Sequence, residues 1–421
     1  METQATSLNN LATCLSAGRF NNMTIEQLKT HKSILIVGYG LEGQMTEKFL
    51  KKYHPTAAIS IVDQKDGEDY LSQQNEFDLA IKSPGVRKEL IKIPYTTATN
   101  IFFANVSNTT IGITGSKGKS TTTKLVYEVL REAGYPARLY GNIGKPMLEY
   151  FLGEMDEKDI LVLELSSYQL DDIEYSPHIS CFLNIYHDHI DYHVNFEQYL
   201  GSKANIVKFS RPEDYFVYNG TFKEIVNLAQ NTRAKMIDFA KQPFPTEYFQ
   251  AANAIASLFD VSEEVFNDLV KHFSGLPHRL QTVGIFKDII FIDDSAATTP
   301  EASIFALNTI RNVCSIILGG LDRQIDFTDL AKKVSEKNIH AIILFPNADI
   351  RLEKALMTQN IDPANIFHAK DMNGAVKLGF LHTIPGDVCL LSPGCASYNQ
   401  YANFSQRGNL FKKLVHECGK K

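Results

Sequence analysis

The stretch GITGSKGKSTTT, residues 112–123, lies between an apolar strand pattern and an amphipathic helix pattern. A glycine-rich turn in this position directs backbone N–H groups and a helix N-terminus toward phosphate oxygens. Lys119 adds a point charge, and Ser120 or Thr121 offers a hydroxyl that suits Mg²⁺. The turn therefore predicts an ATP site, although its glycine spacing departs from the usual four intervening residues. The residues expected to contact the nucleotide are Gly112, Thr114, Gly115, Ser116, Lys117, Gly118, Lys119, Ser120 and Thr121.

The composition is that of an ordinary folded protein. The 421 residues are 44% hydrophobic and 21% charged, with a formal net charge of -6. This balance argues against disorder and offers no basic field that would attract nucleic acid. Six scattered cysteines without CxxC spacing favour buried thiols over disulfides or zinc. Because the N-terminus lacks a signal-peptide pattern and no apolar run approaches the roughly 20 residues that span a bilayer, we expect a cytoplasmic protein without membrane insertion.

Strand-like and helix-like patterns alternate along the chain, which is typical of α/β layers with mainly parallel sheets. Three blocks of this alternation stand out, opening near SILIVGYG, TTIGITG and DIIFIDD. They predict a Rossmann-like N-terminal domain over 1–106, a central P-loop ATPase-like domain over 107–281 and a Rossmann-like C-terminal domain over 282–421. The expected fold is therefore α/β with three domains.

A second glycine motif, Gly38-Tyr39-Gly40-Leu41-Glu42-Gly43, matches GxGxxG in the first block. Asp63 follows about twenty residues later at the end of the next strand pattern, where an acidic residue often meets a ribose hydroxyl. A dinucleotide site is one interpretation. The other is that three glycines only allow a helix to pack closely on a strand. Considered without the rest of the chain, the motif leaves both interpretations open.

Two later segments carry residues suited to metals. LELSSYQL places Glu164 at a strand end, where a carboxylate can bind Mg²⁺. LNIYHDHIDYH contains His187, His189 and His193, but their spacing does not present three ligands on one helical face. The pattern therefore favours a magnesium site over structural zinc.

Seven motifs together resemble the Mur ligases: GITGSKGKSTTT, GNIGKP, LELSSYQL, LNIYHDHID, GLPHR, DDSAATTP and LSPGCASYNQYANFSQRG. The resemblance covers nearly the whole chain from Gly38, and SSYQL with the last motif is most similar to the glutamate-adding members. It implies a three-domain, ATP-dependent amide ligase of peptidoglycan precursor synthesis. UDP-N-acetylmuramoyl-L-alanine would be activated as an acyl phosphate, glutamate would displace phosphate, and ADP would be the other product. No protein nucleophile is required, because such a site works by positioning and charge stabilisation.

The resemblance also assigns nucleotide and metal roles. Lys119 would hold the β- and γ-phosphates, while Ser120 and Glu164 would bind one Mg²⁺. A second Mg²⁺ would lie at His189 beside Lys203, which the family carbamylates; the modification converts a cation into an anion that can ligate metal. Residues similar to those near the adenine, ribose or phosphates are Asn253, His278, Arg279 and Asp294. The resemblance thus implies Lys119, His189, Lys203 and Arg279 as the catalytic set.

Two substrate sites follow from the same resemblance. The first would hold the UDP-linked substrate, which favours a UDP group over NAD at GYGLEG; its residues are Gly38, Tyr39, Gly40, Asp63, Gln64, Lys65, Ser83, Pro84, Gly85, Asn142, Ser166 and Gln169. The second would hold glutamate, with Thr298 and Arg323 at its side-chain carboxylate and Ser397 and Phe404 near its α-carboxylate. Arginine suits a planar carboxylate because it donates two parallel hydrogen bonds. We expect a monomer with these small molecules as its partners.

Departures from the family pattern keep alternatives open. Ala296 stands where a lysine is usual, Arg323 stands where lysine is common, and Phe249-Gln250 replaces a His-Asn pair while Asn253 is kept. Arginine and lysine bind a dicarboxylate differently, so D-glutamate is the expected substrate and L-glutamate the alternative. An NAD-dependent oxidoreductase would leave the phosphate loop unexplained, and a P-loop switch would predict no amino-acid-dependent turnover.

Overall fold

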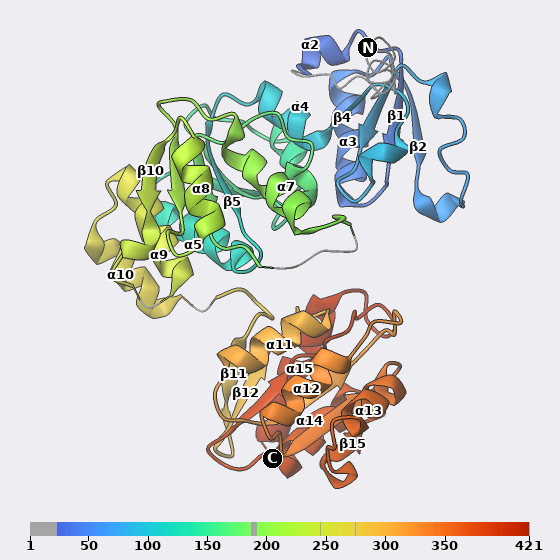
Figure 1. Ribbon diagram of the computed structural model, residues 1–421, viewed down its shortest axis with the longest axis vertical. Coiled ribbons are helices and arrows are strands. Elements are labelled where there is room, and N and C mark those ends of the chain that lie inside the picture. Colours follow the sequence, from blue (N-terminus) through green and yellow to red (C-terminus); the bar gives the residue numbers. More distant parts are fainter. Residues whose placement is uncertain (1–22, 187–191, 245, 274, 421) are drawn as a thin grey trace, which may run out of the picture. The chain divides into compact units, whose positions relative to one another are not determined.

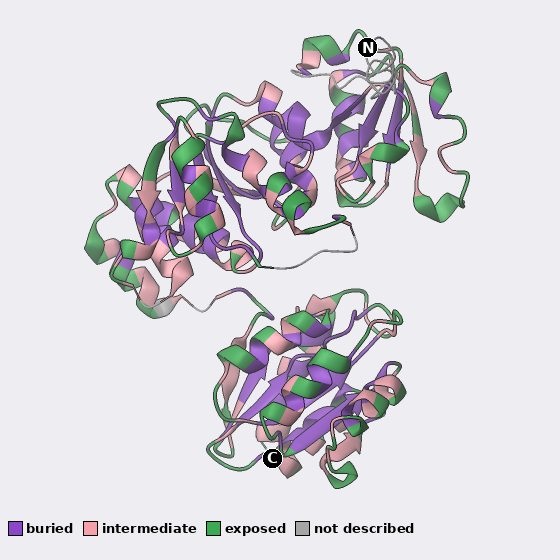
Figure 2. Ribbon diagram, in the orientation of Figure 1, coloured by how far each residue is buried: buried purple, intermediate pink, exposed green. Residues whose placement is uncertain are grey.

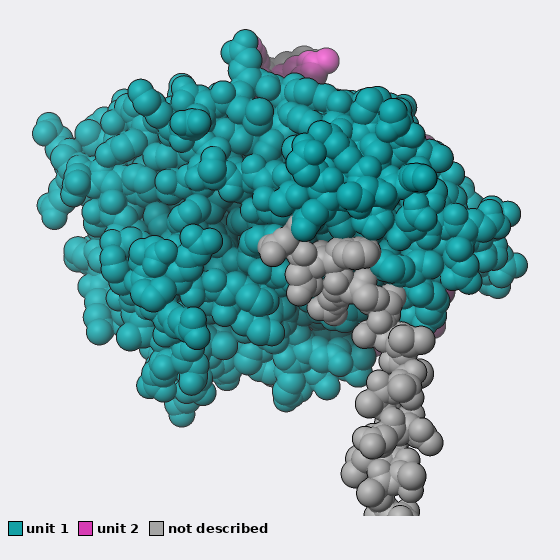
Figure 3. All heavy atoms as spheres, turned by 90° about the horizontal axis from the view of Figure 1, so that it is seen from above, with its two compact units in different colours: residues 1–273 teal, residues 274–421 magenta. Residues whose placement is uncertain are grey.

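The computed structural model describes residues 23–186, 192–244, 246–273 and 275–420. The chain divides into two compact units, residues 1–273 and 274–421 (Figure 3). Three parallel or largely parallel sheets with flanking helices confirm the expected α/β class (Figure 1). The change of unit at residue 273/274 lies eight residues before the expected start of the third domain at 282, and the three domain boundaries themselves stay predictions.

The first sheet of unit 1 is four-stranded, in the order β2-β1-β3-β4, and its neighbouring strands are parallel. Its strands are β1 (Ser33–Val37), β2 (Ala58–Val62), β3 (Leu79–Lys82) and β4 (Tyr95–Thr97), and its helices are α2 (Ile25–Leu28), α3 (Leu41–Tyr53) and α4 (Ala98–Asn105). The glycine motif connects β1 to α3. A Cβ at Gly43 would lie 2.1 Å from the Gly38 carbonyl oxygen, so close packing of helix on strand requires glycine there.

The second sheet of unit 1 is six-stranded and parallel, in the order β10-β9-β8-β5-β7-β6. Its strands are β5 (Thr109–Thr114), β6 (Ala137–Gly141), β7 (Ile160–Glu164), β8 (Ile179–Phe182), β9 (Tyr215–Tyr218) and β10 (Lys235–Asp238). The accompanying helices are α5 (Lys119–Glu132), α6 (Ser167–Leu170), α7 (Phe196–Lys208), α8 (Lys223–Asn231), α9 (Glu247–Ala256) and α10 (Glu263–His272). Strand order reverses at β5, the position where ligands of open α/β sheets usually bind.

Apolar strand sequences explain why these sheets are buried. β7 reads Ile-Leu-Val-Leu-Glu, and helices cover β5, β7 and β8, so that every residue of these strands except the first of β5 is buried (Figure 2). One apolar cluster includes Phe49 of α3 and Phe151 of the 3₁₀ helix η4 (Met147–Leu152), whose ring centroids are 5.8 Å apart. The two sheets of unit 1 therefore share part of their core, which fixes the loops at their carboxyl ends relative to each other.

Unit 2 contains a six-stranded sheet in the order β11-β12-β16-β13-β14-β15. Only the β11–β12 pair is antiparallel among these strands. The strands are β11 (Gln281–Phe286), β12 (Ile289–Asp293), β13 (Val313–Gly319), β14 (Ala341–Phe345), β15 (Ile366–His368) and β16 (Val388–Leu391). The helices are α11 (Pro300–Thr309), α12 (Thr328–Glu336), α13 (Asp349–Met357), α14 (Met372–His382) and α15 (Phe404–Gly419), and an apolar cluster lies on each face of the sheet.

Candidate active site

The phosphate loop joins β5 to α5 at the carboxyl edge of the central sheet. Gly118 precedes α5 with φ 79°, a left-handed conformation that favours glycine. The Lys119 Nζ donates to the carbonyl oxygens of Gly115 (2.8 Å) and Ser116 (3.1 Å). The lysine side chain thus lies along the loop, with its ammonium group over the backbone that is expected to cradle phosphates.

Asn184, two residues after the neighbouring strand β8, holds this loop in place, and the sequence analysis gave it no role. Its side-chain oxygen accepts from the Lys117 N–H (2.8 Å), and its backbone carbonyl accepts from the Ser116 N–H (3.0 Å). Its amide also donates to Glu247 Oε2 (2.8 Å). The only sequence signal was its place in LNIYHDHID, since these contacts join residues far apart in the chain.

Glu164 ends β7, and its backbone pairs with Ile113 of β5, next to the loop. Its Oε1 accepts from Asn142 Nδ2 (2.9 Å), whereas its buried Oε2 has no hydrogen-bond partner among the described residues. A Cβ at Gly141 would lie 2.3 Å from the Glu164 carbonyl oxygen, so β6 can approach β7 here only through glycine. An unpartnered buried carboxylate oxygen beside a phosphate loop fits a hard cation such as Mg²⁺.

Lys203 reaches the same loop from α7. The side chain is buried, and its Nζ donates to the Gly115 carbonyl oxygen (2.9 Å) and lies 3.4 Å from Thr114 Oγ1. The ammonium group also lies 4.9 Å from the centroid of the Tyr199 ring. Lys203 thus contacts the phosphate loop, while its expected place at a second Mg²⁺ and its carbamylation stay predictions. His189, the other residue expected at the second metal, lies outside the described residues.

A cavity of about 690 Å³ opens between the first sheet and the loops of the central sheet. It brings together ten of the twelve residues expected at the UDP-linked substrate: Gly38, Gly40, Asp63, Gln64, Ser83, Pro84, Gly85, Asn142, Ser166 and Gln169. Tyr39 and Lys65 do not line it, and the Tyr39 hydroxyl instead bonds Glu47. The cavity therefore collects residues from both sheets of unit 1, although their contacts with substrate stay predictions.

Asp63 shapes the rim of this cavity through backbone contacts. Its Oδ2 accepts from the Tyr39 N–H (2.6 Å) and its Oδ1 from the Lys65 N–H (3.2 Å). These hydrogen bonds, that of Tyr39 above all, lower the pKa of Asp63. The carboxylate holds the glycine turn in place, a local role that the sequence analysis did not foresee.

In unit 2, the residues expected near ATP gather at the end of β12. His278 Nδ1 lies 2.7 Å from Asp293 Oδ2, and the ring is buried. Asp294 accepts from Ser392 Oγ (2.7 Å) and from the Leu280 N–H (3.2 Å). Burial raises the pKa of Asp294 to about 7, opposed by those hydrogen bonds and by Arg279. Arg279 itself is exposed.

The residues expected at glutamate lie on neighbouring loops of unit 2. The Leu321 N–H donates to the Ala396 carbonyl oxygen (2.8 Å), which joins the loop carrying Arg323 to the loop carrying Ser397. The Arg323 guanidinium carbon lies 5.7 Å from the centroid of the Tyr398 ring. Phe404 begins α15, and its ring contacts His278 edge-on at 6.4 Å. Thr298 is half-buried in the turn before α11.

Asn253 is the remaining residue of the expected ATP set. It lies on α9, which packs on α5 in unit 1, and its Nδ2 donates to Gln242 Oε1 (2.8 Å). The departure Phe249-Gln250 lies on the same helix, where Phe249 packs against Tyr248 and Gln250 donates to the Phe244 carbonyl oxygen (2.8 Å). The replaced pair therefore contributes to packing.

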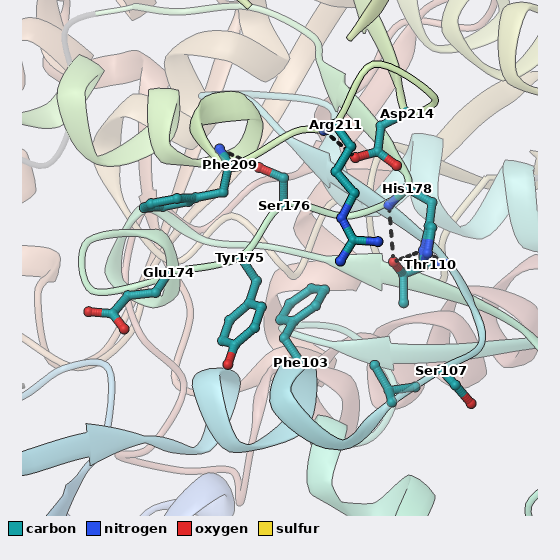
Figure 4. A pocket seen from close by; sticks show the side chains of 11 residues that line it. Phe103, Ser107, Thr110, Glu174, Tyr175, Ser176, His178, Phe209, Arg211 and Asp214 are labelled. Carbon is teal, nitrogen blue, oxygen red and sulfur yellow. Dashed lines mark hydrogen bonds between the residues drawn. The ribbon is translucent and has the colours of Figure 1, made fainter. Parts of the chain in front are cut away.

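A second pocket of about 410 Å³ lies at the opposite, amino-terminal edge of the central sheet (Figure 4). Thr110, at the beginning of β5, contacts His178 there, and Arg211 extends into the space beside Phe103. None of the expected site residues lines this pocket. The strand β5 separates it from the phosphate loop, so it is not part of the candidate active site.

The comparisons with known proteins agree with this geometry. The family model described as the Mur ligase middle domain matches residues 113–279, and the model of the Mur ligase glutamate ligase domain matches residues 278–395. The fold is similar to that of a MurF ligase from Thermotoga maritima solved with ADP, at 15% identity and a TM-score of 0.58 over 96% of this chain and 99% of that one. The chain belongs to the Mur ligase family, whose members are ATP-dependent amide ligases.

Among curated proteins, the chain is 32% identical to the UDP-N-acetylmuramoylalanine–D-glutamate ligase of Streptococcus mutans, over 90% of this chain and 96% of that protein. It is 32% identical to the ligase of the same name from a Geobacillus species, over 92% and 98%. The corresponding figures for the ligase of Natranaerobius thermophilus are 29%, 91% and 98%. The similarity therefore extends over nearly the full length of each relative.

Proposed function

We propose that the protein joins D-glutamate to UDP-N-acetylmuramoyl-L-alanine at the expense of ATP in peptidoglycan precursor synthesis. The similarity to three ligases of that name over nearly their whole length supports the proposal. So does the observation that carries it: the phosphate loop, Glu164 and the large cavity share the carboxyl edge of one unit. That arrangement suits transfer of a phosphoryl group to the end of a bulky substrate.

The reaction balances without a protein nucleophile. The alanine carboxylate of the substrate attacks the γ-phosphorus of ATP, and the bond to the β-phosphate oxygen breaks to release ADP. The amine of glutamate then attacks the acyl carbon, phosphate leaves, and the amine loses a proton to solvent. Lys119 and the loop N–H groups would stabilise charge on the transferring group.

Mg²⁺ fits the residues present. Glu164, with its unpartnered Oε2, and the Ser120 hydroxyl would hold one ion, and Lys203, carbamylated, would hold a second with His189. Bound Mg²⁺ neutralises phosphate charge. The described part of the chain shows no helix long and apolar enough to cross a membrane. We place the enzyme in the cytoplasm as a monomer.

The decisive assay supplies ATP, Mg²⁺ and UDP-N-acetylmuramoyl-L-alanine with either D- or L-glutamate, and follows phosphate release and product mass. We expect phosphate release and a product heavier by one glutamyl residue only with the D isomer. Turnover with L-glutamate alone would reverse the stereochemical assignment. Phosphate release that needs neither substrate would favour a P-loop switch instead.

The carbamate on Lys203 has its own test. Lys203→Ala removes a buried ammonium group and any carboxylate attached to it, so we expect most activity to be lost. Added formate or acetate should restore part of it, because a free carboxylate can occupy the same space. Intact-mass measurement of the wild-type protein under CO₂ provides an independent readout. Full activity of the alanine variant without additives would exclude the carbamate.

A further inference from the structure

The first turn of α3 carries a carboxylate at a place suited to phosphate. The glycine turn Gly38–Gly43 leads into the N-terminus of this 13-residue helix, and such an end attracts anions. Glu42 lies in that turn and lines the 690 Å³ cavity together with Gly40 and Ser83. A fixed negative charge at this place would repel a diphosphate.

The contacts of Glu42 are with a neutral group. Gln169 Nε2 donates to Glu42 Oε1 (3.0 Å), a contact between α3 and α6. Within the described ranges Glu42 forms no ion pair. The cation that most affects it, Lys82, is already paired with Asp172 (3.0 Å) and bonded to the Val86 carbonyl oxygen (3.0 Å). Apart from the N-terminus of α3, the ionised carboxylate is therefore compensated only by a cation that already has its own partner.

Glu47 and Glu149, two other acidic residues on α3 and the element packed against it, have lysine partners of their own. On α3, Glu47 pairs with Lys51 (2.6 Å). On η4, which packs against α3, Glu149 pairs with Lys145 (2.5 Å). Asp63 accepts backbone N–H groups at the cavity rim, and Arg87, Tyr70 and Tyr168 complete the titratable lining. Burial raises the pKa of Glu42, opposed by Gln169 and Lys82.

We propose that Glu42 determines ligand specificity in this cavity. When a diphosphate-bearing ligand binds there, the Glu42 carboxyl group takes up one proton. The inference rests on the proposed function, because it assumes a UDP-linked ligand. One proton moves from solvent to a Glu42 oxygen as the ligand binds, and no other bond changes. The neutral carboxyl group then donates a hydrogen bond where the carboxylate could only accept one.

The test is calorimetric titration of the full-length protein with UDP at pH 8, where the diphosphate is fully ionised. The binding enthalpy is measured in several buffers that differ in their ionisation enthalpy. The slope of the observed enthalpy against the ionisation enthalpy gives the number of protons taken up per UDP bound. We expect the wild type to take up about one proton more per UDP than Glu42→Gln, which is nearly isosteric. UDP should bind Glu42→Gln about tenfold more tightly at pH 8, and the difference should shrink toward pH 6. Glu42→Asp, which keeps the charge, should retain the uptake.

The outcomes separate the two proposals. Equal proton uptake and equal pH dependence in wild type and Glu42→Gln, with UDP binding to both, would overturn the role of Glu42 while the proposed function stands. If UDP saturates neither protein and no glutamate is ligated, the nucleotide assignment and the role of Glu42 fail together. Thermal denaturation of each variant verifies that the fold is intact.

Discussion

Two cationic side chains are buried, Lys203 in unit 1 and Arg407 in unit 2, but they differ in the hydrogen bonds that surround them. Lys203 donates to the phosphate loop, beside Glu164 with its unpartnered oxygen. Arg407, wholly buried on α15, donates to Ser295 O (2.8 Å), Ser295 Oγ (3.0 Å) and the Cys395 carbonyl oxygen (3.0 Å). In the first arrangement the Glu164 oxygen is left for a ligand, whereas Arg407 ties two loops to α15. Burial of a charge alone does not therefore distinguish a site from a scaffold; the remaining hydrogen-bonding capacity does.

The largest effect should come from the phosphate loop. Lys119→Ala removes the charge expected at the transferring phosphoryl group, so we expect kcat/KM for ATP-dependent ligation to fall by about 10³-fold with little change in stability. Lys124→Ala is the matched control, because Lys124 lies on the same helix and pairs with Glu128. Equal losses in both variants would contradict a specific role for Lys119.

Arg407→Ala should lower the stability of the protein through lost contacts in the fold, because Arg407 has no assigned role in the reaction. It leaves a large void and removes the donors of two buried carbonyl groups, so we expect unit 2 to lose about 3–4 kcal/mol of unfolding free energy in denaturant titrations. Arg311→Ala, at an exposed arginine, is the control and should change stability by less than about 0.5 kcal/mol. If Arg407→Ala is as stable as the wild type, Arg407 does not hold the fold together, and the contrast with Lys203 fails.

Asp294 should make stability depend on pH. Its folded-state pKa, about 7, lies above the ordinary value for an aspartate side chain, so the folded protein binds the proton more tightly than the unfolded chain. The stability that this gives is present at low pH and is lost as pH rises through about 7. Relative to Asp294→Asn, we expect the wild type to lose on the order of 2 kcal/mol between pH 5 and 7. If the difference in unfolding free energy between the wild type and Asp294→Asn is the same at every pH, Asp294 is ionised throughout.

The smallest effect should come from a half-buried pair in unit 1. Lys88 and Asp171 lie 2.9 Å apart near the cavity, and both remain partly accessible to water. Lys88→Gln should therefore cost less than about 1 kcal/mol in thermal denaturation. Lys82→Gln removes the ammonium group that lies 3.0 Å from the buried Asp172 carboxylate, so it should lower the unfolding free energy by several times more. Similar losses would mean that exposure does not set the strength of these pairs.

The sequence predicted the layers well because parallel strands buried on both faces are often nearly continuous apolar runs, as β1, β7 and β14 are. The resemblance to the Mur ligases assigned twelve residues to the UDP-linked substrate, and ten of them line the cavity. The Asn184 contacts could not be foreseen, because they depend on strand order. The hydrogen bonds from the Tyr39 and Lys65 N–H groups to Asp63 were not foreseen either, because local backbone hydrogen bonds leave no periodic signal. The expected contact of Asp63 with the nucleotide stays a prediction.

Arg407 is a different kind of omission, because a signal existed. It shares the spacing of Phe411 and Val415 along α15, which places an arginine on the apolar face of the helix. A charged residue at an apolar position predicts a buried polar network. Arg407 lies within a segment that resembles a family motif, and that resemblance alone does not indicate what the arginine contacts.

The close approach of β6 to β7 at Gly141 has a practical consequence for anyone who redesigns this enzyme. Even one added methyl group would collide with the main chain of Glu164, and the strand bearing Asn142 would have to move outward. A library that randomises the surrounding codons should thus return a single amino acid at 141, whatever substrate is selected. Gly141 would then separate the pocket positions that tolerate substitution from those that the backbone restricts to one residue.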